Sequence, residues 1–310
     1  MRFLIAGAGA VGGFVGARLA DAGQDVTVLV RPHRAAGLRE NGLRVTGPAG
    51  TRTARPAVVT ADQLAPGYDA IVLAVKSESS ILGQVMEDIA PAVAPPAMIV
   101  PFLNGIAHVG RLTARFSPAV IGGTLRVATE LEDDGSIRAL APTFEVEVGE
   151  LDGTPSARVS ELAAAFRTAG AQVAVPDDIV GAMWAKWVYI ASIGAVTSLM
   201  RATAGEIVAV PGGDRFARSV IAEAAATAAA AGHPAPADVL RAAEQALTTP
   251  GSPATSSLSR DLSMNRTTEV EAVLADLASR ARATGTPTPL IDVTVLALRI
   301  HNRRLSHQQG

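Results

Sequence analysis

The chain has 310 residues, 27 lysines and arginines against 29 aspartates and glutamates, a formal net charge of -2 and no cysteine. Its length exceeds the size at which a single core usually stops growing, so two domains are expected. The balanced charge offers no basic surface for nucleic acid, the absence of cysteine excludes disulfides and thiol nucleophiles, and the five histidines have no metal-ligand spacing, so no metal is expected.

The first predicted element is a short apolar strand, residues 3–6, followed by G-x-G-x-x-G and a helix over residues 11–22. In that context the first glycine allows a tight turn, the second a close approach of backbone to a pyrophosphate, and the third close packing of helix and sheet. The alternative is a plain glycine-rich turn. The predicted dinucleotide-binding residues are Gly7, Ala8, Gly9, Ala10, Val11 and Gly12.

Arg31 follows the second predicted strand, residues 26–30, at the position where an NAD-binding unit carries Asp or Glu to bind the ribose 2′-hydroxyl. A guanidinium has only hydrogen-bond donors and a fixed positive charge, which suits the 2′-phosphate of NADP. Arg34 is close enough in sequence to join the same site. The sequence therefore favours NADP(H) as the cofactor, and the alternative is that Arg31 is a solvated loop charge.

Alternating strands and helices continue through the first half of the chain. Two apolar runs are typical of parallel strands covered on both faces, and a later segment alternates apolar with polar residues. The predicted elements are strands at 70–75 and 97–103, a helix between them at 79–89, an antiparallel extension at 136–148, a helix at 155–169 and a strand at 171–175.

Lys76 and Asn104 directly follow the two apolar strands. Open α/β sheets bind their ligands beyond the carboxyl ends of such strands, so both residues are candidates for a binding site. Asn104 carries two donors and an acceptor, which suits the orientation of cofactor and substrate. Both residue types are also common in ordinary turns, and that alternative stays open.

Strand signals stop near residue 176, and the remaining chain is predicted to be helical. The fold class is therefore an α/β Rossmann-like, doubly wound N-terminal domain, residues 1–176, plus an all-α C-terminal domain, residues 177–310. Residues 305–310 are expected to be a frayed tail. The predicted helices lie at 178–203, 213–231, 237–247, 267–284 and 290–303.

The segment 179–200 is long and apolar, and its single charge is Lys186. A lysine and two glycines inside the segment argue against a membrane span and indicate the central helix of a large domain. A buried ammonium needs a partner or a chemical role, or else its stem packs between Trp184 and Trp187 while its head reaches water. The N-terminal strand is too short for a signal peptide, so a cytoplasmic protein is expected.

These residues, together with the segment containing Ser257 and Glu269, occur in the order found in the ketopantoate reductase (2-dehydropantoate 2-reductase) family, which the chain resembles over nearly its whole length. By themselves Ser257 and Glu269 are explained as helix-capping residues. The motifs that carry the resemblance are G-x-G-x-x-G, Arg31, Val75-Lys76, Asn104-Gly105, Trp184-x-Lys186, Gly205-Glu206-Ile207, Thr255-Ser256-Ser257-Leu258-x-x-Asp261 and Thr268-Glu269.

The resemblance implies reduction of the ketone of 2-dehydropantoate by NADPH to (R)-pantoate, in pantothenate biosynthesis. Lys186 would be the general acid, Asn104 would contact both cofactor and substrate, and Ser257 would contact the substrate carboxylate. Glu269 would hold the cofactor near its nicotinamide ribose. Lys186, Asn104 and Glu269 are thus the three predicted catalytic residues. Lys76 and Ala128 would line the cofactor.

The chain departs from the family pattern in the substrate site. Family members carry asparagines four, eight and eighteen residues after the catalytic lysine, where this chain has Ile190, Gly194 and Ala204. Loss of three hydrogen-bonding side chains weakens discrimination between substrates. Either Arg201 or Ser192 takes over recognition of the carboxylate, or the substrate is another, less polar 2-oxo acid or ketone.

Two other classes of protein remain as alternatives. A dinucleotide-binding regulator without turnover would not need a proton donor at Lys186. A β-hydroxyacid dehydrogenase also joins a nucleotide domain to a helical domain around a lysine, but the segment from Ser257 to Glu269 favours the reductase. The expected partner is a small-molecule 2-oxo acid, without nucleic acid or membrane. The alanine-rich helix at 220–231 is compatible with packing in the core or across a homodimer.

Overall fold

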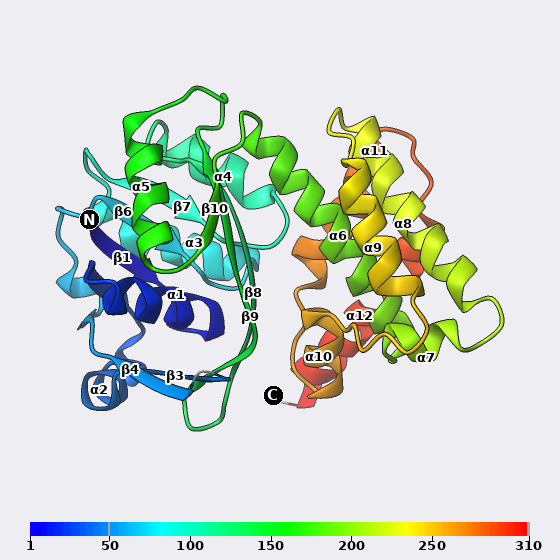
Figure 1. Ribbon diagram of the computed structural model, residues 1–310, viewed down its shortest axis with the longest axis horizontal. Coiled ribbons are helices and arrows are strands. Elements are labelled where there is room, and N and C mark those ends of the chain that lie inside the picture. The colour runs from blue at the N-terminus through cyan, green and yellow to red at the C-terminus, as the bar shows by residue number, and fades with distance from the viewer. Residues whose placement is uncertain (49, 309–310) are drawn as a thin grey trace. The chain divides into compact units, whose positions relative to one another are not determined.

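The computed structural model describes residues 1–48 and 50–308, and its contacts divide the chain into two units (Figure 1). One unit is Met1–Leu103 with His108–Ala182, and the other is Asn104–Ala107 with Met183–Gly310. The first is built from strands and helices and the second from helices, so the predicted fold class is confirmed. The units divide inside a continuous helix rather than at residue 176, and the short segment with Asn104 groups with the helical unit.

A five-stranded parallel sheet, in the order β5-β2-β1-β6-β7, forms the centre of the first unit. The order reverses beside β1, and open sheets bind ligands at such a switch point. The strands are β1 (Arg2–Ala6), β2 (Asp25–Leu29), β5 (Ala57–Val59), β6 (Ala70–Leu73) and β7 (Met98–Pro101). The helical segments that connect or follow them are α1 (Ala10–Asp21), α2 (Pro32–Asn41), η1 (Ala61–Gln63), α3 (Ser79–Ile89), η2 (Ala90–Ala92) and α4 (Ala107–Phe116).

Both faces of this sheet are buried, which explains the continuous apolar runs in its strands. Along β1, Phe3 and Ile5 belong to one hydrophobic cluster, while Leu4 and Ala6 belong to the cluster on the opposite face. Successive side chains of a strand point to opposite faces, so an alternating polar residue here would be buried without a partner.

The predicted antiparallel extension belongs to a second sheet, in the order β10-β9-β3-β4, with β8 paired antiparallel to β9. The side chain of Ile137 on β9 occupies the space where a Cβ at Gly13 would lie, so this sheet packs directly on α1. Its strands are β3 (Leu43–Gly47), β4 (Gly50–Ala54), β8 (Gly122–Leu131), β9 (Ile137–Gly149) and β10 (Gln172–Ala174), and helix α5 (Ala157–Thr168) lies between β9 and β10 in sequence.

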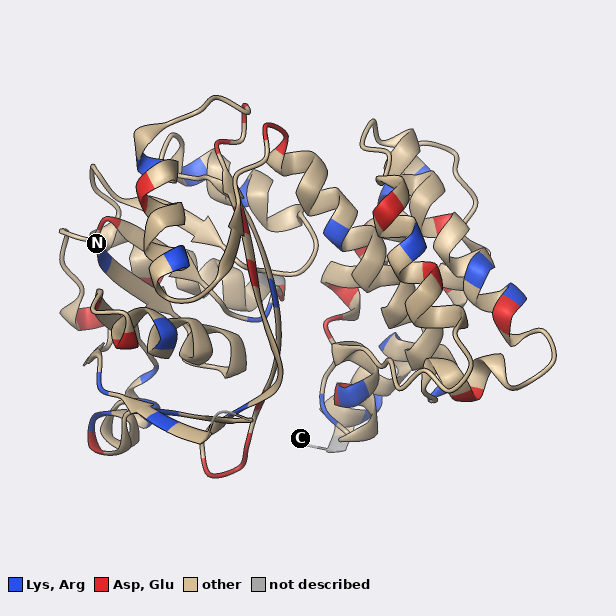
Figure 2. Ribbon diagram, in the orientation of Figure 1, with Lys and Arg blue, Asp and Glu red and all other residues tan. Residues whose placement is uncertain are grey.

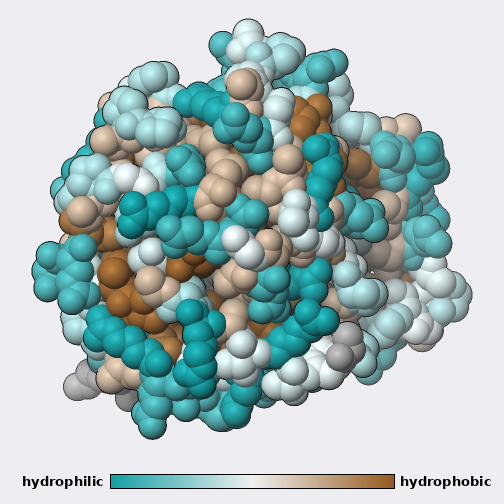
Figure 3. Space-filling model, turned by 60° about the vertical axis from the view of Figure 1, so that its left-hand side comes forward, coloured by the Kyte–Doolittle hydropathy of each residue, from teal (hydrophilic) through white to brown (hydrophobic). Residues whose placement is uncertain are grey.

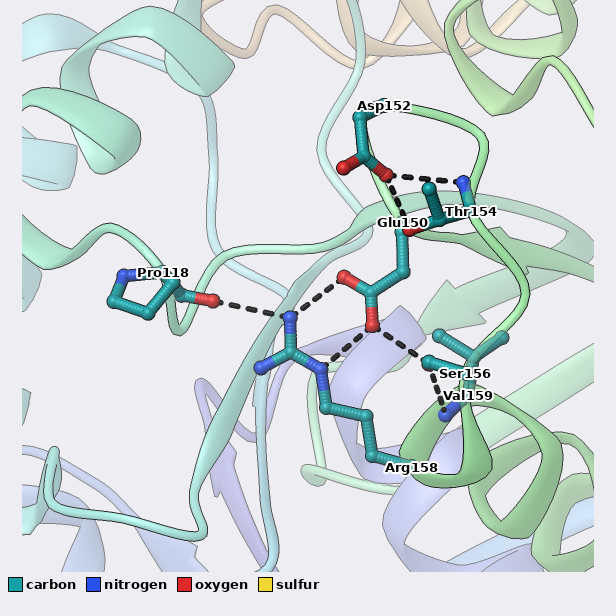
Figure 4. Close-up of polar contacts among 7 residues, drawn as sticks. All are labelled: Pro118, Glu150, Asp152, Thr154, Ser156, Arg158 and Val159. Atoms are coloured by element: carbon teal, nitrogen blue, oxygen red, sulfur yellow. Dashed lines mark hydrogen bonds and ion pairs between the residues drawn. The ribbon is translucent and has the colours of Figure 1, made fainter.

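The start of α5 is fixed by a charged cluster at the end of β9 (Figure 4). Arg158 donates from Nε and Nη2 to the two carboxylate oxygens of Glu150, at 2.7 and 2.6 Å, and Ser156 Oγ donates to the same carboxylate at 2.7 Å. Arg158 also donates to the carbonyl oxygen of Pro118 at 3.0 Å. The Glu150 side chain is only 11% exposed, and the Arg158 guanidinium holds the pKa of its carboxyl below the usual value.

Glu150→Gln is expected to lower the free energy of unfolding by about 1–2 kcal/mol at pH 7, because two donors lose a charged acceptor. A carboxyl whose pKa is lowered by folding stabilises the protein above its ordinary pKa of about 4.3, and that contribution is lost as the pH falls through the folded-state value. The difference between variant and wild type in urea unfolding should therefore shrink in acid. The matched control is Glu145→Gln, whose exposed ion pair with Arg126 at 3.5 Å should contribute little.

The second unit is a set of helices, and α6 is its most apolar member. By length and composition α6 is able to cross a membrane, but 67% of its most apolar window is buried inside the protein, as in the core helix of a soluble domain. Its helices are α6 (Ile179–Met200), α7 (Ala204–Val208), α8 (Gly213–Ala230), α9 (Ala237–Thr248), α10 (Ser257–Ser263), the π-helix η3 (Glu271–Ala275), α11 (Asp276–Ala283) and α12 (Pro289–Gln308).

The alanine-rich helix α8 buries Val220, Ile221 and Ala224 inside the unit, so this part of the helix packs in the core. The expectation of a frayed tail was wrong for residues 305–308, because α12 continues to Gln308 and Leu305 is 7% exposed. Residues 309–310 of the predicted tail lie outside the described part of the chain.

Acidic and basic residues are interspersed over both units (Figure 2). The face shown in Figure 3 carries small hydrophobic areas set among hydrophilic residues. Many of the ion pairs are exposed, for example Arg2 with Asp25 at 3.3 Å and Arg218 with Glu244 at 3.3 Å. Such pairs contribute little to stability, so the fold depends mainly on its buried clusters.

Candidate active site

The glycine loop lies between β1 and α1, at the switch point of the parallel sheet. Gly7 has φ of +101°, and a Cβ there would lie 2.7 Å from Val75 Cγ1 and 2.8 Å from the carbonyl oxygen of Ala74. A Cβ at Gly12 would collide with the carbonyl oxygen of Gly7. Two of the three glycines are therefore required by the fold itself, for conformation and for space.

Gly9 has a different role, because no atom lies within 4 Å of the position that its Cβ would take. It is the N-cap of α1, and no side chain caps the helix there. The first amide groups of a helix attract anions, and an open glycine at that point allows a phosphate to approach the backbone. The loop thus fits a dinucleotide pyrophosphate, held by Gly9 and the amides of Ala10, Val11 and Gly12.

The end of β2 contacts this loop directly. The amide of Gly7 donates to the carbonyl of Leu29 at 3.3 Å, and Arg34 Nη1 donates to the carbonyl of Ala8 at 3.1 Å. Arg31 is the N-cap of α2 and is exposed. The structure therefore brings Arg34 to the dinucleotide loop, while Arg31 lies at the start of α2, just after the end of β2. In this fold the end of the second strand is where the ribose of the cofactor is recognised.

Lys76 and Ala128 come from two different sheets. Lys76 is exposed and follows Ala74 and Val75, the two residues that pack against Gly7. Ala128 lies on β8 at an irregularity of the β8–β9 pairing, between Val127 and Thr129. Both residues belong to the same unit as the glycine loop. Strand β8, which carries Ala128, also packs against α1, the helix that follows this loop.

In the helical unit, Asn104 and Glu269 are brought together although 165 positions separate them in the sequence. Asn104 Nδ2 donates to Glu269 Oε2 at 3.4 Å, and both side chains are partly exposed. Next to Asn104, Gly105 has φ of +73° and packs against the carbonyl oxygen of Ala272. An amide and a carboxylate at one point provide donors and acceptors for a polar ligand.

Lys186 lies in the first half of α6 and is partly buried, while both flanking residues, Ala185 and Trp187, are buried. The rings of Trp184 and Trp187 lie 5.0 Å apart between centroids. Arg280 lies over both rings, with its Cζ 5.5 and 5.6 Å from the two centroids. The packing of an arginine against both rings was not predicted.

Ser257 is exposed at the first position of α10. Its neighbours connect α10 to α6: Ser256 Oγ lies 3.0 Å from Thr197 Oγ1, and Leu258 covers Gly194. A Cβ at Gly194 would lie 2.9 Å from Leu258 Cδ1, and Leu258 is 2% exposed. The space for a side chain at position 194 is therefore filled by leucine, a feature that the sequence did not reveal.

Of the other positions predicted for substrate recognition, three are apolar or buried and one is exposed. Ala204 is fully buried, and Ile190 is partly exposed. Ser192 is also fully buried, and its hydroxyl donates to the carbonyl of Val188 at 2.8 Å, so the prediction that it replaces the missing asparagines was wrong. Arg201, exposed beyond the end of α6, stays a candidate.

Comparison with known proteins agrees with this arrangement. The family model for ketopantoate reductase PanE/ApbA matches residues 3–153, and the model for the C-terminal part of the same family matches residues 178–301. A 2-dehydropantoate 2-reductase of Mesorhizobium japonicum is 33% identical, with 100% of this chain and 99% of that protein covered. An uncharacterized oxidoreductase of Bacillus subtilis, YkpB, is 31% identical over 97% of this chain and 99% of its own.

Among solved structures, a 2-dehydropantoate 2-reductase from Methylococcus capsulatus has a TM-score of 0.85 and 29% identity, with 99% of this chain and 98% of that chain covered. The fold and the glycine loop define a dinucleotide-dependent oxidoreductase. The chain belongs to the ketopantoate reductase family, and it is an oxidoreductase of the 2-dehydropantoate 2-reductase type.

Proposed function

We propose that this protein reduces the ketone of a 2-oxo acid with NADPH, and that the first candidate substrate is 2-dehydropantoate, reduced to (R)-pantoate in pantothenate biosynthesis. Family membership supports the reaction class. The observation that carries the proposal is the pairing of Asn104 with Glu269, in the same unit as Lys186. A cytoplasmic location fits a chain without cysteine.

In this proposal Lys186 is the general acid. NADPH, when bound, would supply the hydride for the carbonyl carbon, and negative charge would then develop on the carbonyl oxygen. The Lys186 ammonium donates a hydrogen bond to that oxygen and then transfers its proton to it. Asn104 orients the substrate and the cofactor, Glu269 holds the nicotinamide ribose, and Ser257 binds the substrate carboxylate.

The lysine content of the chain supports this role. Lys76 and Lys186 are its only two lysines, so the other 25 of its 27 basic residues are arginines. Arginine serves as well as lysine for surface charge, but it holds its proton too tightly to act as an acid near neutral pH. The chain therefore has lysine only at the two positions that the proposal assigns, Lys76 to cofactor binding and Lys186 to catalysis.

NADPH is proposed over NADH because Arg34 contacts the glycine loop and Arg31 follows the end of β2, where this fold recognises the ribose. Arg31→Ala is expected to raise the KM for NADPH about tenfold, the equivalent of about 1.4 kcal/mol, and to leave the KM for NADH unchanged. The matched control is Arg39→Ala on the same helix, since Arg39 donates to Val58 and Gln63 rather than to the loop. An unchanged preference for NADPH in Arg31→Ala would mean that the 2′-phosphate is bound elsewhere.

A second candidate substrate class is favoured by the closed positions on α6. Leu258 fills the space beside Gly194, and Ala204 is fully buried, so two of the three asparagine positions of the family offer no polar group to a substrate. Without polar side chains at these positions, the site has fewer groups to bind the hydroxyl of 2-dehydropantoate and discriminates less in its favour. A 2-oxo acid with a branched apolar side chain is the alternative.

Oxidation of NADPH by the purified protein, followed with 2-dehydropantoate and with a panel of branched apolar 2-oxo acids, tests both candidates. A higher kcat/KM for 2-dehydropantoate supports the first candidate, and a higher value for an apolar 2-oxo acid supports the second. If NADPH binds but no compound of the panel is reduced, the enzyme proposal fails and a dinucleotide-binding regulator becomes the better description.

A further inference from the structure

The segment that follows Glu269 is a π-helix, η3, rather than an α-helix. In a π-helix the backbone hydrogen bonds join residues five apart instead of four, so each turn is wider than in an α-helix. Such turns are found frequently at functional sites. It begins at Glu271, two residues after the carboxylate that pairs with Asn104. The position of the Glu269 side chain therefore depends on the shape of this turn.

Trp187 holds the turn from one side. Its indole Nε1 donates to the carbonyl of Val273 at 2.8 Å, inside the π-helix, and the bond is buried. The Trp187 ring is 1% exposed, so water cannot replace this donor. Removing the N–H would leave a buried carbonyl without its partner, which is costly enough to shift the turn.

The segment that contains Asn104 holds the turn from another side. Gly105 packs against the carbonyl of Ala272, where any side chain would collide with it. One residue earlier, Asn104 donates to Glu269 at 3.4 Å, a distance at the long end for a hydrogen bond. A small displacement of the turn would therefore break the contact between the amide and the carboxylate.

We infer that Trp187 is a positioning residue for the reaction: its indole N–H fixes the π-turn, and the turn sets the place of the Glu269 carboxylate and of the Asn104 amide. This inference rests on the proposed function, in which both groups orient the cofactor and the substrate. Trp187 follows Lys186 directly in sequence, so one turn of α6 carries the proton donor and also the residue that positions its two polar partners.

Trp187→Phe removes the N–H and keeps an aromatic ring. It is expected to lower kcat/KM about 10- to 100-fold, because displacement of an orienting group by about 1 Å has effects of that size. The matched control is Trp184→Phe: both indole rings contact Arg280, and the bond to the carbonyl of Val273 in the π-turn comes from Trp187. Trp184→Phe should lose less than about threefold, and equal losses in both variants would overturn the inference.

A double-mutant cycle with Glu269→Ala separates positioning from general damage. If Trp187 acts through Glu269, Trp187→Phe should have little further effect on kcat/KM once the carboxylate is gone, whereas its effect on melting temperature should persist. The same loss of kcat/KM in both backgrounds would overturn the inference. Should Trp187→Phe fail to fold, replacement of Trp187 by benzothienylalanine keeps the bicyclic shape and removes only the N–H.

Cofactor affinity provides a readout that does not depend on turnover. The Kd for NADPH, measured by the fluorescence of the nicotinamide itself, should rise in Trp187→Phe and should rise no further in the double variant. If the wild type binds NADPH in this way but reduces no 2-oxo acid, the proposed reaction fails while the positioning inference stands. If Trp187→Phe binds NADPH as the wild type does and keeps its kcat/KM, the inference fails alone.

Discussion

Lys186→Ala is expected to lower kcat for the reduction of a 2-oxo acid by about 100- to 10,000-fold, the usual contribution of a positioned general acid. Binding of NADPH should change little, because the proposal assigns Lys186 to the substrate oxygen and not to the cofactor. Lys186 is partly buried between buried neighbours on α6, and it is one of only two lysines in the chain. Stopped-flow measurement of NADPH oxidation under single-turnover conditions would give the chemical rate directly.

Two controls make this result specific. Lys186→Arg keeps the positive charge but not the transferable proton, so it should retain substrate binding and lose turnover. Added methylammonium should restore part of the rate of Lys186→Ala, because it supplies the missing acid, and it should have no effect on the wild type. Turnover within a few-fold of wild type in Lys186→Ala would show that another group donates the proton.

The second large effect is expected at the glycine loop. Gly9→Ala should leave the melting temperature unchanged, since the space around its Cβ is open, but should raise the Kd for NADPH at least about tenfold, because the methyl group occupies the place of the pyrophosphate. Calorimetric titration with NADPH and a thermal unfolding curve on the same sample would measure both quantities.

Gly12→Ala is the matched contrast within the same loop. Its Cβ would collide with the carbonyl oxygen of Gly7, so the loop and α1 must move and the protein should lose about 1–3 kcal/mol of stability even without cofactor. If Gly9→Ala bound NADPH as tightly as the wild type, the cofactor phosphates would lie elsewhere. Loss of stability in Gly9→Ala would mean that its role is structural.

Local sequence patterns predicted the central elements well. The parallel strands have both faces buried and therefore consist of continuous apolar residues, and α3 was predicted with the bounds that the structure has. The patterns failed where burial is partial. Strand β4 is largely exposed and β3 is mostly half-buried, so both lack an apolar signal, and α2 is rich in polar residues. These elements were not predicted.

The candidate site divides in the same way. Residues that follow β1, β2, β6 and β7 were found from sequence, because the end of a parallel strand fixes where the next residues lie. The role of Trp187 was missed, although a tryptophan in an apolar helix must find an acceptor for its N–H when it is buried. Only the structure identifies that acceptor as Val273, 86 positions later in the chain.

The sequence by itself determined that this chain has a dinucleotide-binding domain and a helical domain, and that it resembles one family of reductases, because these features depend on short motifs and local periodicity. Only the tertiary structure decided that Asn104 meets Glu269, that Trp187 holds the π-turn, and that Leu258 closes the space at Gly194. Each of these contacts joins residues far apart in the sequence, and packing between helices rather than any local preference sets which side chains meet.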